Sequence, residues 1–93
     1  MKGYVIFKVT TANGAVPIDN ALVEISIEKN SFIKRTSKSG FSERFEISFD
    51  EDEDCCICAT AKISSPGYED CFIDDLKIYK NVTLVRIANL TEI

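Results

Sequence analysis

Four cysteines are the residues of this sequence best suited to bind a metal or to form a covalent cross-link. Three lie in the stretch Cys55-Cys56-Ile57-Cys58, and the fourth is Cys71. Four thiolates could hold zinc or an iron–sulfur cluster, but strong zinc sites take paired ligands from loops with C-x2-C spacing. On an extended strand, Cys56 and Cys58 point to one face about 6.5–7 Å apart and Cys55 points to the other. We therefore expect no metal and no cofactor.

A disulfide and free thiols are the two alternatives for these cysteines. In an oxidising compartment, Cys71 could bridge to one of the other three across neighbouring strands, provided that the two Cα atoms lie within about 7 Å. In a reducing compartment, all four remain thiols that pack as small apolar groups in the core and on the strand surface. We favour the thiols, although the redox state of the four cysteines stays open.

The remaining candidate chemistry is limited because the sequence has no histidine. A Ser-His or Cys-His nucleophile, an imidazole base and a histidine metal ligand are all excluded within this chain. The acidic run Asp50-Glu51-Asp52-Glu53-Asp54 offers carboxylates for Ca²⁺, but it lacks the internal glycine and terminal glutamate of an EF-hand loop. We expect this run to be a solvated loop that faces a partner. No catalytic residue is assigned, and the chain is expected not to be an enzyme.

The first predicted strand is apolar on both faces. Val5 and Phe7 alternate along the chain with Tyr4 and Ile6. A strand of this kind is central in its sheet or is covered by another surface. Tyr4 and Ile6 are therefore either covered within the chain or part of a docking surface for a neighbouring domain or a second copy.

Length and charge restrict the domain organisation and the partners. We expect one domain over residues 1–93. Eleven basic against fifteen acidic side chains give a net charge of −4, which argues against nucleic acid and anionic membranes as partners. The apolar stretch near the N-terminus is shorter than the roughly 7–15 residues of a signal peptide or the roughly 20 of a membrane span. The chain as given is thus expected to be cytoplasmic, with association with a spore or cell envelope as the alternative.

Alternation of apolar and polar residues dominates the chain and predicts an all-β protein. Turn signals recur about every ten residues, which is typical of an antiparallel β-sandwich. In the segment 41–49, the alternation predicts that Phe41 shares one face with Phe45, Ile47 and Phe49. The predicted strands cover residues 5–9, 21–27, 32–36, 41–49, 55–65, 71–73, 76–79 and 82–89.

Three sequence blocks add a resemblance to a known family. A turn at Asn13-Gly14 precedes Val16-Pro17-Ile18-Asp19-Asn20-Ala21-Leu22-Val23-Glu24-Ile25, and a hairpin motif follows at Thr36-Ser37-Lys38-Ser39-Gly40. The third block is Ile63-Ser64-Ser65-Pro66-Gly67-Tyr68-Glu69. In this order the blocks resemble transthyretin-like, carboxypeptidase-regulatory-like domains. The residues that define the fold in this resemblance are Gly14, Pro17, Ala21, Gly40, Gly67 and Tyr68.

The resemblance implies a fold and a class of function. The fold would be a seven-stranded antiparallel Greek-key β-sandwich of the transthyretin (prealbumin) type. Such domains are accessory modules that stiffen a chain or mediate contacts beside catalytic domains, and one similar group is the N-terminal module of bacterial spore cortex-lytic enzymes. The one enzymatic branch, hydroxyisourate hydrolysis, depends on histidines that are missing here.

We therefore expect a non-catalytic structural or protein-interaction module of a bacterial cell-wall or spore-associated system. Its partner would be a protein or a neighbouring catalytic domain, with a homodimer as one form. The alternative is a carbohydrate- or peptidoglycan-binding module. Sugar sites use exposed aromatic platforms, and because the chain has no tryptophan, the candidates are an exposed phenylalanine, Tyr4, Tyr68 and Tyr79.

Overall fold

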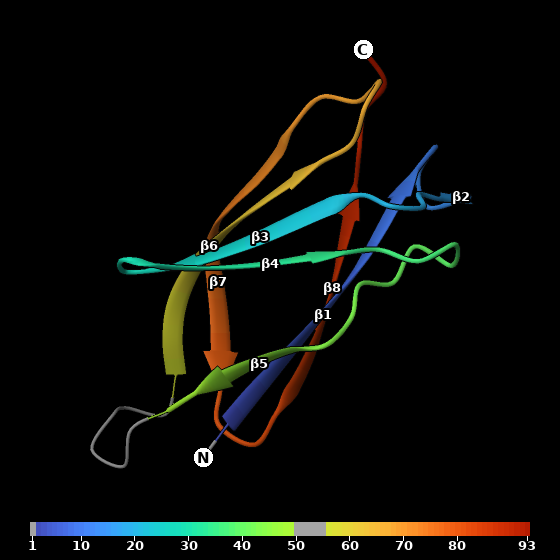
Figure 1. Cartoon of the computed structure of the whole chain (residues 1–93). Coiled ribbons are helices and arrows are strands. Elements are labelled where there is room, and N and C mark those ends of the chain that lie inside the picture. The colour runs from blue at the N-terminus through green and yellow to red at the C-terminus, as the bar shows by residue number, and fades with distance from the viewer. Residues whose placement is uncertain (1, 50–55) are drawn as a thin grey trace.

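The computed structural model describes residues 2–49 and 56–93 as two packed sheets of four strands each (Figure 1). This confirms the prediction of an all-β, sandwich-like architecture. In the first sheet, β1 lies between β8 on one side and β2 and β5 on the other. The second sheet has the order β4-β3-β6-β7. The strands are β1 (Lys2–Thr11), β2 (Val16–Pro17), β3 (Leu22–Ile27), β4 (Asn30–Arg35), β5 (Phe45–Ser48), β6 (Cys56–Ser64), β7 (Cys71–Tyr79) and β8 (Thr83–Asn89).

The core forms between the sheets because alternate residues of each strand point inward. In β1 the inward residues are Val5, Phe7 and Val9, and all three are fully buried. Phe7 meets Phe45 edge to face, with ring centroids 6.1 Å apart. The other strands contribute short rows of inward aliphatic side chains, among them Val23, Ile25, Ile63, Leu76 and Ile78.

The structure departs from the predicted seven antiparallel strands in two ways. An eighth strand, β2, is a two-residue segment that pairs with the end of β1. The second departure is that β1 and β8 pair in parallel. Before β8 the chain crosses between sheets, and the Val82 carbonyl accepts a hydrogen bond from the Tyr4 N–H at 3.0 Å. Because this anchors the crossing beside the start of β1, β8 has to run in the same direction as β1.

Close backbone approach at this crossing depends on Gly3. A Cβ at this position would lie 2.5 Å from the carbonyl oxygen of Tyr79. Real Cβ atoms do not approach an oxygen so closely, so only glycine allows the end of β7 to pack here. The sequence interpretation did not single out this residue.

The segment predicted as one strand over 41–49 is shorter, and the prediction for Phe41 is wrong. Phe45 and the residues that alternate with it are buried, whereas Phe41 is exposed. The buried residue at this place is Ser42. Its hydroxyl accepts a hydrogen bond from the Phe7 N–H at 3.0 Å, and its own N–H donates to the Phe7 carbonyl at 2.8 Å. Since Ser42 is held inward, Phe41 faces outward.

The two segments predicted at 71–73 and 76–79 form the single strand β7. The pairing with β6 shifts between Ala59 and Ala61, where two residues of β7 stand opposite one residue of β6. These two residues are Asp74 and Asp75, and both are exposed. A bulge of this kind places both acids in solvent while the apolar residues on either side still face the core.

Candidate interaction surface

The outward side of the first sheet carries a contiguous apolar patch. In the parallel pair of β1 and β8, Ile6 lies beside Val85, and Lys8 lies beside Ile87. Val85 and Ile87 expose 53% and 65% of their surface. Tyr4 and Ile6 are half-buried, which agrees with the central position of β1 in its sheet. We call the set Tyr4, Ile6, Phe41, Val85 and Ile87 the apolar face.

Two cations stack on the two rings of the apolar face: Arg44 at its edge, and Lys8 within it, between Phe41 and Ile87. The ammonium of Lys8 lies 5.1 Å from the centroid of the Phe41 ring. The guanidinium of Arg44 lies 4.3 Å from the centroid of the Tyr4 ring. Cation–π contacts of this kind hold both partners in place. Because the whole chain carries a net charge of −4, this positive charge is a local feature of one face.

Glu46 links one of these cations, Arg44, to Lys2. Its carboxylate accepts a hydrogen bond from Lys2 at 3.0 Å and another from Arg44 at 3.3 Å. The hydrogen bond and the charge of Lys2, aided by Arg44, lower the pKa of Glu46 below its ordinary value of 4.5. Lys2 and Arg44 therefore share one carboxylate, and the three groups together keep a net positive charge.

The lowered pKa of Glu46 gives a testable expectation. In an NMR titration followed at the side-chain carboxyl carbon, Glu46 should titrate below 4.5. The Lys2→Met variant should move the midpoint upward, since Lys2 is the main cause of the shift. With a depressed folded-state pKa, the contribution to stability is present above the ordinary value and is lost as the pH falls through the lowered one. An unchanged midpoint in Lys2→Met would show that Lys2 does not hold the carboxylate.

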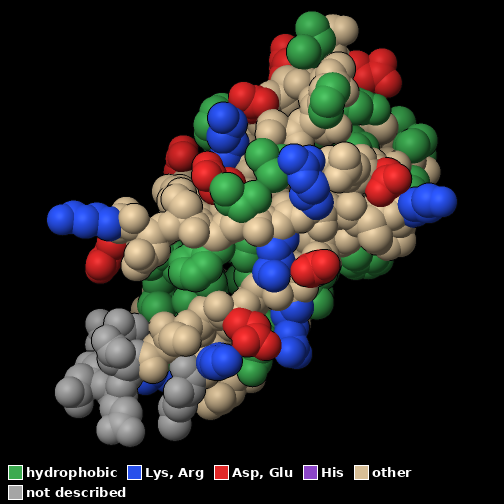
Figure 2. Space-filling view, in the orientation of Figure 1, with side chains coloured by type: hydrophobic (Ala, Val, Ile, Leu, Met, Phe, Trp, Pro, Cys, Tyr) green, Lys and Arg blue, Asp and Glu red, His purple; other side chains and the backbone are tan. Residues whose placement is uncertain are grey.

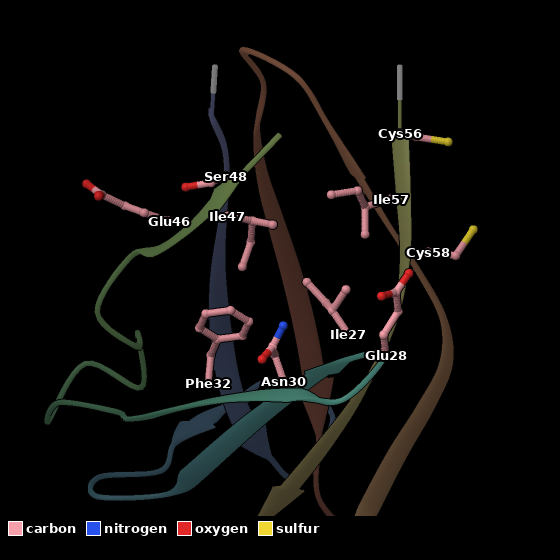
Figure 3. Close-up of a pocket in the computed structure, with 10 residues that line it drawn as sticks. All are labelled: Ile27, Glu28, Asn30, Phe32, Glu46, Ile47, Ser48, Cys56, Ile57 and Cys58. Atoms are coloured by element: carbon pink, nitrogen blue, oxygen red, sulfur yellow. The ribbon is translucent and has the colours of Figure 1, made fainter. Parts of the chain in front are cut away.

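A cavity of about 630 Å³ opens between the two sheets on the side of β4 and β5. Figure 3 shows Ile27, Phe32, Ile47 and Ile57 pointing toward one another across it. In the space-filling view a patch of hydrophobic side chains marks this hollow (Figure 2). Residues 50–55 lie outside the described residues.

The structure separates the cysteines that the sequence placed in one cluster. Cys56 and Cys58 lie on the same face of β6 and point away from the cavity (Figure 3). Cys71 pairs with Ile63, five residues further along β6 than Cys58. At about 3.3 Å per residue this is roughly 17 Å, far beyond the reach of a disulfide. The predicted alternative of a bridge from Cys71 to Cys56 or Cys58 is thus wrong in this register.

Several candidate residues lie elsewhere or outside the described chain. The acidic run Asp50-Glu51-Asp52-Glu53-Asp54 and Cys55 are not among the described residues. Within residues 2–49 and 56–93, no group of three or more His, Cys, Asp or Glu side chains could hold a metal ion. No helix in the same ranges has the length and apolarity needed to cross a membrane.

The aromatic residues considered for sugar binding do not form one platform. The face of Tyr4 is stacked by Arg44. Tyr68 is half-buried against the core, and Tyr79 is exposed at the end of β7. Phe72 is the most exposed of the aromatic side chains, and it lies on the outer side of the other sheet beside Lys62.

The residues expected to define the fold occupy turns and close contacts. Gly14, Gly40 and Gly67 all have positive φ. Pro17 lies in β2 directly before the chain leaves the first sheet, and Ala21 is fully buried directly before β3.

Sequence reasoning found part of the apolar face and missed the rest. It singled out Tyr4 and Ile6 from their alternation, but Val85 and Ile87 join them only through the parallel register of β1 and β8. The alternation of Val85 and Ile87 with Leu84 and Arg86 was a usable signal. It could not show which strand would lie beside them.

Comparison with known proteins adds a likeness in fold. No protein family matches the chain, and no curated protein matches it either. Among solved structures, the chain is similar to part of the Bacillus anthracis TIE protein, with a TM-score of 0.71 and 15% sequence identity. The match covers 99% of this chain and 17% of that protein. The chain thus spans about one-sixth of the length of its structural relative, and at this identity the likeness concerns the fold alone.

Proposed function

We propose that the chain is a non-catalytic protein-interaction module with a transthyretin-like, carboxypeptidase-regulatory-like Greek-key fold. The strand order supports this assignment: β3 and β4 form one hairpin of the second sheet, β6 and β7 form another, and β5 lies between them in sequence but in the first sheet. The family-like turns at Gly40 and Gly67, both with positive φ, add support.

The observation that carries the interaction function is the apolar face. Large side chains such as Ile87, which is 65% exposed, are unusual on a sheet face that only meets water. Lys2 and Arg44 lie beside Tyr4 at the edge of the face, and Lys8 lies within it between Phe41 and Ile87. A complementary partner presents an apolar surface that carries acidic groups. We propose that this partner is a neighbouring domain or a separate protein of a bacterial cell-wall or spore-associated system, a setting based on the sequence resemblance.

A photo-cross-linking experiment in the native host tests the proposal. A photoreactive amino acid at Val85 should trap a specific partner, whereas the same group at the exposed Thr60 on the other sheet should not. With the purified partner, the Ile87→Glu variant should bind at least about tenfold more weakly than the wild type, as expected for a central contact. Circular dichroism would verify that the variant is folded.

Two results would contradict the proposal. One is a partner that binds the Ile87→Glu variant as tightly as the wild type. The other is that isolated peptidoglycan retains both the wild type and the Ile87→Glu variant while no protein is cross-linked at Val85. This result would favour the carbohydrate-binding alternative.

A further inference from the structure

The second sheet ends in two strands that each have one open edge. Among the described strands, β4 pairs only with β3, and β7 pairs only with β6. Edge strands present backbone N–H and C=O groups that can pair with another chain. Neither β4 nor β7 contains proline, which would block such pairing.

The two edges carry opposite charges. β4 ends with Lys34 and Arg35. β7 contains Asp74, Asp75 and one cation, Lys77, and directly follows Asp70, so its edge is acidic on balance. Two β4 edges repel each other, as do two β7 edges, whereas a β4 edge attracts a β7 edge. Charge therefore selects the unlike pairing.

The ion pairs that already exist on these edges do not prevent the pairing of a β4 edge with a β7 edge. Asp70 lies 3.8 Å from the ammonium of Lys62, and Lys34 lies 3.5 Å from a carboxylate oxygen of Glu43. Both pairs are at the surface, where an ion pair is worth about 0–1 kcal/mol. The charged groups can thus exchange partners at little cost.

The register within the sheet sets which residues would meet. The four strands alternate in direction, so a second copy displaced sideways places its β4 antiparallel to β7 of the first. Ile33 pairs with Glu24, Glu24 with Lys62, and Lys62 with Phe72. Ile33 and Phe72 therefore lie on the same level and on the same face of the sheet.

When a second copy is displaced in this way, its Ile33 becomes the cross-strand neighbour of Phe72 in the first copy. Ile33 is 56% exposed and Phe72 is 66% exposed. An aromatic ring beside a β-branched side chain is a favourable cross-strand pair. Two residues away on the same face, Arg35 falls opposite Asp70, the residue before β7. Each edge thus supplies one apolar group and one charge that match the other edge.

We propose that this chain associates head to tail with further copies of itself, β4 of one copy pairing antiparallel with β7 of the next. The bulge at Asp74 and Asp75 interrupts the edge of β7, so the pairing covers about the four residues that precede it and is weak. An interface between two different edges does not close on itself unless a ring forms, so it generates a series of growing oligomers. This surface is separate from the apolar face.

Sedimentation velocity of the purified chain tests the proposal. At about 1 mM protein and about 50 mM NaCl, where a weak association is populated and charges are little screened, the wild type should form dimers and larger species. At about 0.5 M NaCl the association should weaken. The Arg35→Glu variant should lower the association constant at least about tenfold, and the double variant Arg35→Glu with Asp70→Arg should restore it.

Two single-edge variants distinguish an unlike pairing from a like one. Phe72→Glu blocks the β7 edge, and Ile33→Glu blocks the β4 edge, so each variant alone should stay monomeric. A pairing of the two altered edges would place two carboxylates opposite each other and is disfavoured. Mixed together, the two variants should form a 1:1 dimer, because the unaltered β4 edge of one pairs with the unaltered β7 edge of the other. The dimer should grow no further, since both of its outer edges are blocked. The Thr60→Lys variant, changed on a central strand of the same face, should associate like the wild type. All the substituted side chains are exposed, and circular dichroism would verify their folding.

A wild type that sediments as a monomer at about 1 mM and low salt would overturn the proposal. The charges on the two edges would then serve to prevent edge pairing. Self-association of either single-edge variant alone, or a mixture that remains monomeric, would overturn it as well. Variants of the apolar face such as Ile87→Glu should not change any of these results. Failure of this proposal is therefore distinct from failure of the proposed function.

Discussion

Replacing Gly40 by alanine should lower the free energy of unfolding by about 2–5 kcal/mol. Gly40 has a φ of +83°, which costs an L-residue about 1–2 kcal/mol. A Cβ at this position would also lie 2.7 Å from the carbonyl oxygen of Val9 and 3.0 Å from the Cβ of Pro17. Inserting a methyl group into such a well-packed place typically costs a further amount of about 1–3 kcal/mol. The backbone cannot move away easily, since the Gly40 carbonyl accepts the Val9 N–H at 2.8 Å.

Gly67 provides a matched control for this prediction. It has nearly the same backbone conformation, with a φ of +87°, but no atom lies within 4 Å of where its Cβ would be. Gly67→Ala should therefore lose only the backbone contribution of about 1–2 kcal/mol. Urea unfolding followed by far-ultraviolet circular dichroism measures both values. Equal losses for the two variants would show that the contacts around Gly40 do not matter.

Replacing Thr36 by valine should destabilise the protein by about 2–6 kcal/mol. The buried Thr36 hydroxyl donates a hydrogen bond to the Ile18 carbonyl at 2.7 Å and accepts one from the Ala21 N–H at 2.8 Å. Valine has nearly the same shape but neither donates nor accepts. It would leave two backbone groups without these partners at the crossing from the first sheet to the second, at about 1–3 kcal/mol each.

The Thr36→Ser variant separates the hydroxyl from the shape of the side chain. Serine keeps both hydrogen bonds and loses only one methyl group. The Thr36→Ser variant should therefore lose about 1 kcal/mol of unfolding free energy, close to the value for one buried CH₂ group. Thermal and urea unfolding should rank the proteins as wild type, Thr36→Ser and then Thr36→Val. A valine variant as stable as the serine variant would mean that water or a shifted backbone satisfies the two groups.

Both predictions concern places where local sequence already indicated a turn. The spacing from Thr36 to Gly40 predicted a hairpin, and glycine is the residue that tolerates positive φ. What the sequence did not indicate is the neighbour: Val9 and Pro17 meet Gly40 only after the chain has crossed between the sheets. The size of the expected effect depends on these distant contacts.

The face of Phe41 illustrates why alternation alone is insufficient. Its position agreed with an inward direction, because period-2 counting assumes an unbroken strand. The chain instead breaks between Ser42 and Phe45, and the hydrogen bonds between Phe7 and Ser42 hold Ser42 inward. Ser42 and Phe45 are both buried although they are an odd number of positions apart, so the alternation changes phase across this break. Phe41 thereby joined the apolar face.

For the cysteines, alternation along the strand was a correct guide. Strand geometry correctly placed Cys56 and Cys58 on one face, because both lie on β6 and the alternation there is regular. The sequence left a bridge to Cys71 open, since a bridge depends on how β6 and β7 align. The observed register puts Cys71 opposite Ile63 and removes that bridge for Cys56 and Cys58.

By itself, the sequence determined that the chain is an all-β protein without histidine chemistry, because alternation is a local property of each strand and residue types are read directly. Only the tertiary structure decided how the strands lie beside one another. The parallel pairing of β1 with β8 joins residues about eighty positions apart and brings Ile6 beside Val85. The order of the second sheet likewise leaves β4 and β7 at its edges. Pairing partners depend on crossings and register, which no short stretch of sequence encodes, and both proposed surfaces arise from them.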